Sequence, residues 1–152
     1  MNITIANVRD FLVPNPAGKG KRAVFPDEAH VWVGRAAPRW GLKASPLRNP
    51  FRKKGSMLVS SAGHPRMSER PVKPAYPPTL EHIVGHYRSW LRQRIREEHP
   101  SIQLRELDRL RALHEKQDLT LICCCETWNG EGEAPGLCHA EVVREELLRG
   151  AT

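Results

Sequence analysis

Hydrophobic residues recur with the period of an α-helix over much of the second half of the chain. From Leu80 to Ile95 they form one stripe, and Thr79 before it is a candidate N-cap. Pro100 ends this predicted helix, and Ser101 is placed to cap a second one. The side chains of the second helix that we expect to face a core are Leu104, Leu107, Leu110 and Leu113.

A third helix is predicted from His139 to Arg149, and Gly150 follows as its end. Its inward side chains are predicted to be Val142, Val143, Leu147 and Leu148. In the first helix, Trp90 belongs to the apolar stripe, so we expect it to be largely buried.

Three short apolar segments have the pattern of β-strands. Ile3 and Ile5 indicate one near the start, residues 31–33 a second that ends at Gly34, and residues 119–123 a third. Because the chain reaches the third strand through two helices, a parallel, right-handed crossover is implied. We expect an α/β fold with a small, mainly parallel sheet flanked by helices, in a Rossmann-like arrangement.

Between residues 35 and 78 this patterning is lost. The stretch from Arg35 to Lys73 has ten basic residues and one acidic residue, Glu69, and it is rich in proline. Such a segment fits neither a regular helix nor a central strand. We expect a long, basic, proline-rich loop over 35–78, within a single α/β domain that spans residues 1–152.

The composition adds limits on partners and location. The formal net charge is +7, from 24 basic and 17 acidic residues, which permits nucleic acid or an anionic small molecule as a partner. No apolar run is long enough to cross a bilayer, and the first residues lack the pattern of a secretory signal, so no membrane association is expected. Three of the four cysteines are consecutive, which suits a reduced, cytoplasmic setting better than a disulfide framework.

The cysteine cluster is the sharpest chemical signal. Cys123 and Cys125 share one face of the third strand, because side chains alternate across a strand. Cys138 and His139 follow at the start of the last helix, so these three sulfurs and one imidazole predict a tetrahedral zinc site. A second hypothesis makes Cys138 a nucleophile, because a helix N-terminus stabilises a thiolate, with His139 as its acid or base. A third is that the cysteines only pack in the core.

A second candidate site lies where the strand over residues 31–33 ends. Ligands of open α/β sheets bind beyond the carboxyl ends of parallel strands, and Arg35 follows such an end. Gly34 would let a ligand approach the backbone, and Asn49, held extended before Pro50, offers an amide for hydrogen bonding. We therefore predict Arg35 and Asn49 as ligand-binding residues, and the alternative is a tight turn with an exposed arginine.

Other patterns in the sequence give weaker evidence for a functional site. His82 and His86 are four residues apart on one helix face, but no glutamate follows His82, so the metalloprotease motif is excluded. Basic residues at steps of four along the same helix are typical of a solvated face. The sequence has no P-loop, no Gly-rich dinucleotide loop and no nucleophile-elbow motif.

Four segments are more informative about the protein family in combination than each is alone. They are Ile5-Ala6-Asn7-Val8-Arg9, Val31-Trp32-Val33-Gly34-Arg35, Ser45-Pro46-Leu47-Arg48-Asn49-Pro50-Phe51, and Cys123-x-Cys125 with Cys138-His139-Ala140-Glu141-Val142. In this combination the chain resembles an uncharacterised bacterial and phage family, the domain of unknown function family 4326. The resemblance covers nearly the whole chain and implies that the cysteine and Asn-Pro-Phe elements form a site, with no established reaction.

Three functions remain open at this point. The first is an enzyme or binding protein for a phosphorylated small molecule or nucleotide, in which Arg35, Asn49, Cys138 and His139 line one pocket. The second is a nucleic-acid-binding module whose basic loop contacts phosphates, and the third is a non-catalytic interaction protein with a structural zinc. Salt separates the first two, because binding to a phosphate backbone weakens steeply with ionic strength.

Overall fold

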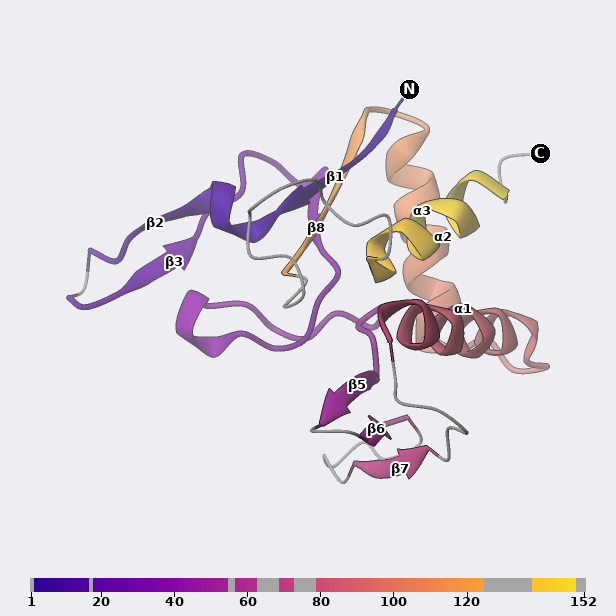
Figure 1. Ribbon diagram of the computed structural model, residues 1–152. Coiled ribbons are helices and arrows are strands. Elements are labelled where there is room, and N and C mark those ends of the chain that lie inside the picture. Colours follow the sequence, from indigo (N-terminus) through magenta and orange to yellow (C-terminus); the bar gives the residue numbers. More distant parts are fainter. Residues whose placement is uncertain are drawn as a thin grey trace.

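The centre of the structure is a three-stranded parallel sheet (Figure 1). The computed structural model describes the residues numbered 2–16, 18–54, 57–62, 69–72, 79–124 and 138–149. The strands of the sheet are β1 (Ile3–Asn7), β8 (Leu119–Cys123) and β4 (His30–Trp32), in that order. β8 runs parallel to both neighbours. The predicted strands and their parallel direction are confirmed.

The helices have the predicted positions. They are α1 (Leu80–Arg96), α2 (Ile102–His114) and α3 (His139–Arg149). The side chain of Thr79 accepts a hydrogen bond from the backbone N–H of His82, and that of Ser101 accepts one from Leu104. Both predicted N-caps are therefore confirmed, since each satisfies a backbone donor that the helix itself leaves unpaired.

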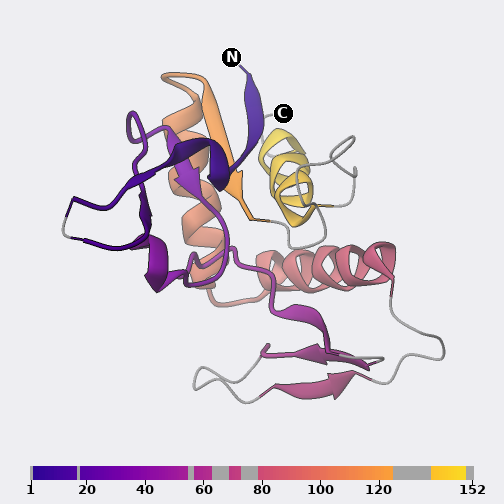
Figure 2. The ribbon, with the colours of Figure 1, turned by 60° about the vertical axis from the view of Figure 1, so that its left-hand side comes forward.

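α2 and α3 lie beside the parallel sheet, and α1 lies beyond the carboxyl end of β8, where it packs against both of these helices and against β5 (Figure 1, Figure 2). Alternate β8 residues, Leu119, Leu121 and Cys123, share a hydrophobic core with buried side chains of α1, α2 and α3. Ile122 points to the opposite face and lies outside this core cluster, although it too is fully buried.

The Rossmann-like arrangement, with helices on both faces of the sheet, is not confirmed in the part of the chain that the structure describes. The fold there is a mixed α/β arrangement with one three-stranded parallel sheet. The physical reason is the connection from β1 to β4. It holds a short 3₁₀ helix, η1 (Val8–Phe11), and the antiparallel hairpin of β2 (Leu12–Pro14) and β3 (Lys21–Ala23) instead of an α-helix.

The expected loop over 35–78 is wrong in its central part. A second antiparallel sheet forms from β5 (Phe51–Lys54), β6 (Met57–Ser60) and β7 (Arg70–Val72), in that order, and lies below α1 in Figure 2. A proline is tolerated here because Pro71 lies in β7, which is an edge strand, where no ladder hydrogen bond is lost on the outer side. The short 3₁₀ helix η2 (Pro38–Trp40) precedes this sheet.

Two expectations about the core need correction. Leu148 is 50% exposed, whereas Leu147 beside it is 2% exposed, so only the latter points inward. Trp90 packs against the core but is only partly buried, and Tyr87, one turn earlier, is the fully buried aromatic residue of α1. Glu146 of α3 is also buried, and it forms ion pairs with Arg92 and Arg149.

Replacing Ser101 with alanine is expected to lower the free energy of unfolding by about 1–2 kcal/mol. The Ser101 hydroxyl is buried, accepts from Leu104 N at 3.1 Å and donates to the Arg94 carbonyl at 2.9 Å, so two groups lose a partner. Urea denaturation measures the change. Ser89→Ala, at an exposed position inside α1, is the matched control, and equal midpoints for the two variants would contradict the role of Ser101.

Candidate functional site

The carboxyl ends of the three parallel strands meet at one edge of the sheet. Asn7 at the end of β1 lies beside Cys123 at the end of β8. On the other side of β8, the backbone N–H of Val33, directly after β4, donates to the Ile122 carbonyl at 2.9 Å. α3 begins at the same edge, because Cys138 contacts Cys123. The edge therefore gathers residues that are far apart in the sequence.

Two of the predicted cysteines are in contact at this edge. The Sγ atoms of Cys123 and Cys138 are 3.1 Å apart, and both side chains are buried. Cys138 immediately precedes α3, where its Sγ accepts a hydrogen bond from the Ala140 N–H at 3.4 Å. The N-terminal end of a helix and a backbone donor both stabilise negative charge on the sulfur.

His139 is held in a fixed orientation by two groups. Its Nε2 lies 2.8 Å from the Val33 carbonyl oxygen, and its ring meets the Tyr87 ring edge-on, with 5.4 Å between centroids. A carbonyl can only accept, so Nε2 donates, and in the neutral imidazole the proton is on Nε2 and the acceptor is Nδ1. The amino-acid sequence alone does not identify this partner of His139, because a backbone carbonyl of a distant strand leaves no signature in side-chain spacing.

Tyr87 connects this edge to the segment before β5. Its hydroxyl donates to the Leu47 carbonyl at 2.7 Å, and the side chain is fully buried. Burial, with a smaller contribution from a charge on Cys138, raises the pKa of Tyr87 far above its usual value. The phenol therefore remains a protonated donor, and the Leu47 backbone is fixed beside the site.

Arg35 lies at the end of β4, as predicted, but much of its guanidinium is already engaged. Its Nε donates to the Asn49 carbonyl at 2.9 Å and its Nη2 to the Phe51 carbonyl at 2.8 Å. The Asn49 Oδ1 in turn accepts from the Phe51 N–H at 2.9 Å. Arg35 thus holds the Asn-Pro-Phe element against the strand end, a structural role that the sequence did not reveal.

Two further polar residues at this edge escaped the sequence analysis. Asn7 is 6% exposed, and its Oδ1 accepts from the Arg9 N–H at 2.9 Å. Glu141 lies in the first turn of α3, where burial raises the pKa of its carboxyl and negative charges on Cys138 and Glu145 add to that shift against Arg144. The signal for Asn7 was present, since a polar side chain continues the apolar alternation of Ile3 and Ile5.

The predicted zinc ligands are only partly placed. Cys123, Cys138 and His139 come to the same edge, whereas Cys125 lies outside the described residues. Among the residues that the structure describes, no group of three or more His, Cys, Asp or Glu side chains is arranged to hold a metal ion. Zinc prefers four ligands, so the zinc site, which depends on Cys125, stays a prediction.

The remaining sequence candidates have structural roles. The His82 side chain completes a capping box with Thr79, and the His86 ring packs on Phe51 with 5.5 Å between centroids. Basic residues along α1 pair with α3 through Arg88–Glu145 and Arg92–Glu146. No helix of the described residues is long and apolar enough to cross a membrane.

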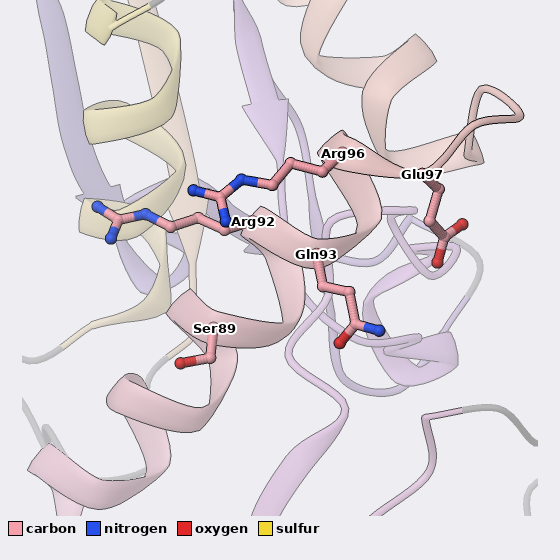
Figure 3. A pocket seen from close by; sticks show the side chains of 5 residues that line it. All are labelled: Ser89, Arg92, Gln93, Arg96 and Glu97. Atoms are coloured by element: carbon pink, nitrogen blue, oxygen red, sulfur yellow. The ribbon is translucent and has the colours of Figure 1, made fainter.

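A surface pocket lies on the C-terminal half of α1 (Figure 3). Its lining residues are Ser89, Arg92, Gln93, Arg96 and Glu97. Within the part of the chain that the structure describes, these five residues form no hydrogen bond or ion pair with Cys123, Cys138 or His139, and Arg92 already pairs with Glu146. The pocket is therefore separate from the sheet edge at which those three residues meet.

Comparisons with known proteins give one result. Neither the curated proteins nor the solved structures contain a match to this chain. A family model, described as a domain of unknown function and designated DUF4326, matches residues 18–149. The matched part includes β4, the Asn-Pro-Phe element, all three helices and the contact between Cys123 and Cys138. The chain therefore belongs to the DUF4326 family of domains of unknown function.

Proposed function

We propose that this domain binds a phosphorylated small molecule, such as a nucleotide, at the carboxyl edge of its parallel sheet, with Cys138 as the reactive group. The observation that carries the proposal is the position of Cys138 and His139 at the start of α3, beside the ends of all three parallel strands. Ligands of α/β sheets bind at such edges, and helix N-termini favour anions.

In this proposal, each of four residues at the edge of the sheet has a separate chemical role. Cys138 acts as the nucleophile, since the Ala140 N–H and the helix end stabilise its thiolate. His139 acts as its acid or base through Nδ1, because Nε2 is hydrogen-bonded to the Val33 carbonyl. Asn49 supplies a neutral donor, since its Nδ2 makes no hydrogen bond within the part of the chain that the structure describes. Arg35 contributes positive charge and holds Asn49 in place.

The charge distribution favours a small anion over nucleic acid. Arg52 forms a two-bond ion pair with Glu69, and Arg35 is engaged with two backbone carbonyls. The ion pair offsets the charge of Arg52, and the two carbonyls occupy donors of Arg35 that would otherwise be open to a phosphate backbone, although Arg35 keeps its charge. The hydrogen bond from Arg52 is the largest cause that holds the pKa of Glu69 below its usual value; burial opposes it, and the charges of Arg52, Lys54 and Arg35 add to the lowering, so this carboxylate stays ionised.

Thermal unfolding with ATP or inorganic phosphate tests the proposal. A nucleotide at about 100 times its Kd is expected to raise the Tm by roughly 5–10 °C. Asn49→Asp keeps the oxygen that caps Phe51 but replaces the amide donor with a negative charge, so its apparent affinity should fall at least about tenfold. Asn15→Asp adds the same charge in the β2–β3 hairpin connection and should retain the protection.

Three results would contradict the proposal. The first is an unchanged Tm at millimolar nucleotide and phosphate, and the second is full protection of Asn49→Asp. The third is binding of single-stranded DNA or RNA that weakens steeply with salt while the nucleotide has no effect, which would favour a nucleic-acid-binding module. Elemental analysis of protein purified without chelators separates a thiol centre from zinc, because about one equivalent of metal that is lost in Cys138→Ser would assign the cluster to a metal.

A further inference from the structure

We propose that Cys123 and Cys138 form a redox-active pair that closes reversibly to an intramolecular disulfide. The two Sγ atoms are already 3.1 Å apart, and a disulfide bond requires a separation of about 2.05 Å. Rotation of the two side chains about their Cα–Cβ bonds is the movement that closes this gap. The proposal needs no ligand, so it can fail while the proposed anion binding stands, and the reverse is equally true.

The positions of the two cysteines give their thiols different reactivity toward an oxidant. Cys123 is the last residue of the central strand β8 and is 4% exposed, whereas Cys138 directly precedes α3 and is 8% exposed. Cys138 also has the Ala140 N–H at its sulfur and the positive end of the helix behind it. Cys138 is therefore the thiol that meets an oxidant first, and Cys123 is the resolving thiol.

Burial selects the kind of oxidant and the kind of product. The two sulfurs are largely enclosed, so a small oxidant such as hydrogen peroxide reaches them more readily than a bulky disulfide reagent does. Once Cys138 is oxidised, its nearest described thiol is Cys123, so the internal bond forms in preference to a mixed disulfide. Cys124 directly follows β8 and is only partly buried, and alternation along the strand predicts that its side chain takes the face opposite to that of Cys123.

The reaction balances with hydrogen peroxide as the oxidant. The Cys138 thiolate attacks one peroxide oxygen, the O–O bond breaks, and the departing hydroxide takes a proton to become water, which leaves a sulfenic acid. The Cys123 sulfur then attacks that sulfur, the S–S bond forms, the S–O bond breaks, and a second water leaves. Two thiols are oxidised, one peroxide is reduced, and a dithiol such as dithiothreitol reverses the change.

The disulfide would join the end of β8 to the start of α3 and would consume the thiol that we propose as the nucleophile. Oxidation would therefore switch off chemistry at Cys138 without unfolding the domain. The cross-link also restricts the unfolded chain between the two positions, so the oxidised protein is expected to unfold at a higher temperature than the reduced one.

The test uses the full chain, reduced, desalted and treated with stoichiometric peroxide. After alkylation of the denatured protein, two of the four cysteines should be protected, and digestion after glutamate residues should yield one peptide pair joined between Cys123 and Cys138. Dithiothreitol should restore all four alkylation sites. Cys124→Ser, the matched control, should form the same bond at a similar rate, whereas Cys138→Ser should react with peroxide at least about tenfold more slowly.

The wild-type digest alone decides the proposal, even if a cysteine variant fails to fold. A bond from Cys138 to Cys124 or Cys125 would overturn the assignment of Cys123, and sulfinic acid on Cys138 with Cys123 still open to alkylation would overturn the pair altogether. Resistance to peroxide until a chelator is added would show that the sulfurs hold a metal, and it would also overturn the proposal.

Discussion

Replacing Tyr87 with alanine is expected to lower the free energy of unfolding by about 3–5 kcal/mol, the cost of removing a large aromatic side chain from a core. Tyr87 has no exposed surface, it belongs to the hydrophobic core, and its ring meets the His139 ring edge-on. Its hydroxyl also fixes the Leu47 carbonyl. Urea denaturation followed by circular dichroism measures the loss.

Two further variants separate packing from hydrogen bonding at this position. Tyr87→Phe keeps the ring and should cost only about 1–2 kcal/mol, because the Leu47 carbonyl loses a buried donor. Trp90→Ala is the matched control for size, and it should cost less than Tyr87→Ala because Trp90 is only partly buried. If Trp90→Ala proved the more damaging change, the facing of α1 described above would be wrong.

Leu147→Ala is expected to cost about 2–5 kcal/mol, whereas Leu148→Ala should change stability by less than about 0.5 kcal/mol. The two leucines are adjacent in α3 and have the same helix propensity, so the comparison isolates burial. Leu147 is 2% exposed and belongs to the core, and Leu148 is 50% exposed. The same urea titration measures both variants.

This pair of variants also tests which face of α3 points toward the core. A rotation of the helix by one residue would exchange the two leucines and would move Glu146 out of its ion pairs with Arg92 and Arg149. Comparable losses in the two alanine variants would be the sign of such a rotation.

The helices could be predicted from the sequence because their signals are local. The repeat from Leu80 to Ile95 and the N-caps Thr79 and Ser101 lie within a few residues of the groups that they affect. β8 could be predicted for a related reason, since a short strand at the centre of a sheet is mostly apolar, and four of its five residues are buried. The parallel direction then followed from the order of the elements.

The small antiparallel sheets could not be predicted in this way. β7 has three residues and contains Pro71, which argues against a strand unless its place at an edge is known. β2 and β3 are equally short. The prediction that Leu148 faces inward was wrong for a different reason. Hydrophobicity alone favours leucine over glutamate at buried positions of a helix, whereas Glu146 is buried because it pairs with Arg92 of α1 and with Arg149 of α3.

The candidate site was predicted in its side chains but not in its backbone. The sequence places Cys123, Cys138 and His139 together, and the structure has them at one edge. The carbonyl of Val33 that orients His139 belongs to every residue type alike, so no sequence pattern can identify it. The bonds from Arg35 to the Asn-Pro-Phe backbone were hidden for the same reason.

Hydrogen bonds and ion pairs hold α3 in place near both of its ends, and they limit how the thiols of Cys123 and Cys138 can approach each other. At its start, His139 is hydrogen-bonded to the Val33 carbonyl. Toward its other end, Glu146 binds Arg92 of α1 and Arg149, and its backbone carbonyl accepts from Arg111 of α2. A rod about 16 Å long that is held in this way has little freedom to tilt or slide. Because the backbone at the start of α3 is held in place, the Cys138 sulfur can approach Cys123 mainly by rotation of its own side chain.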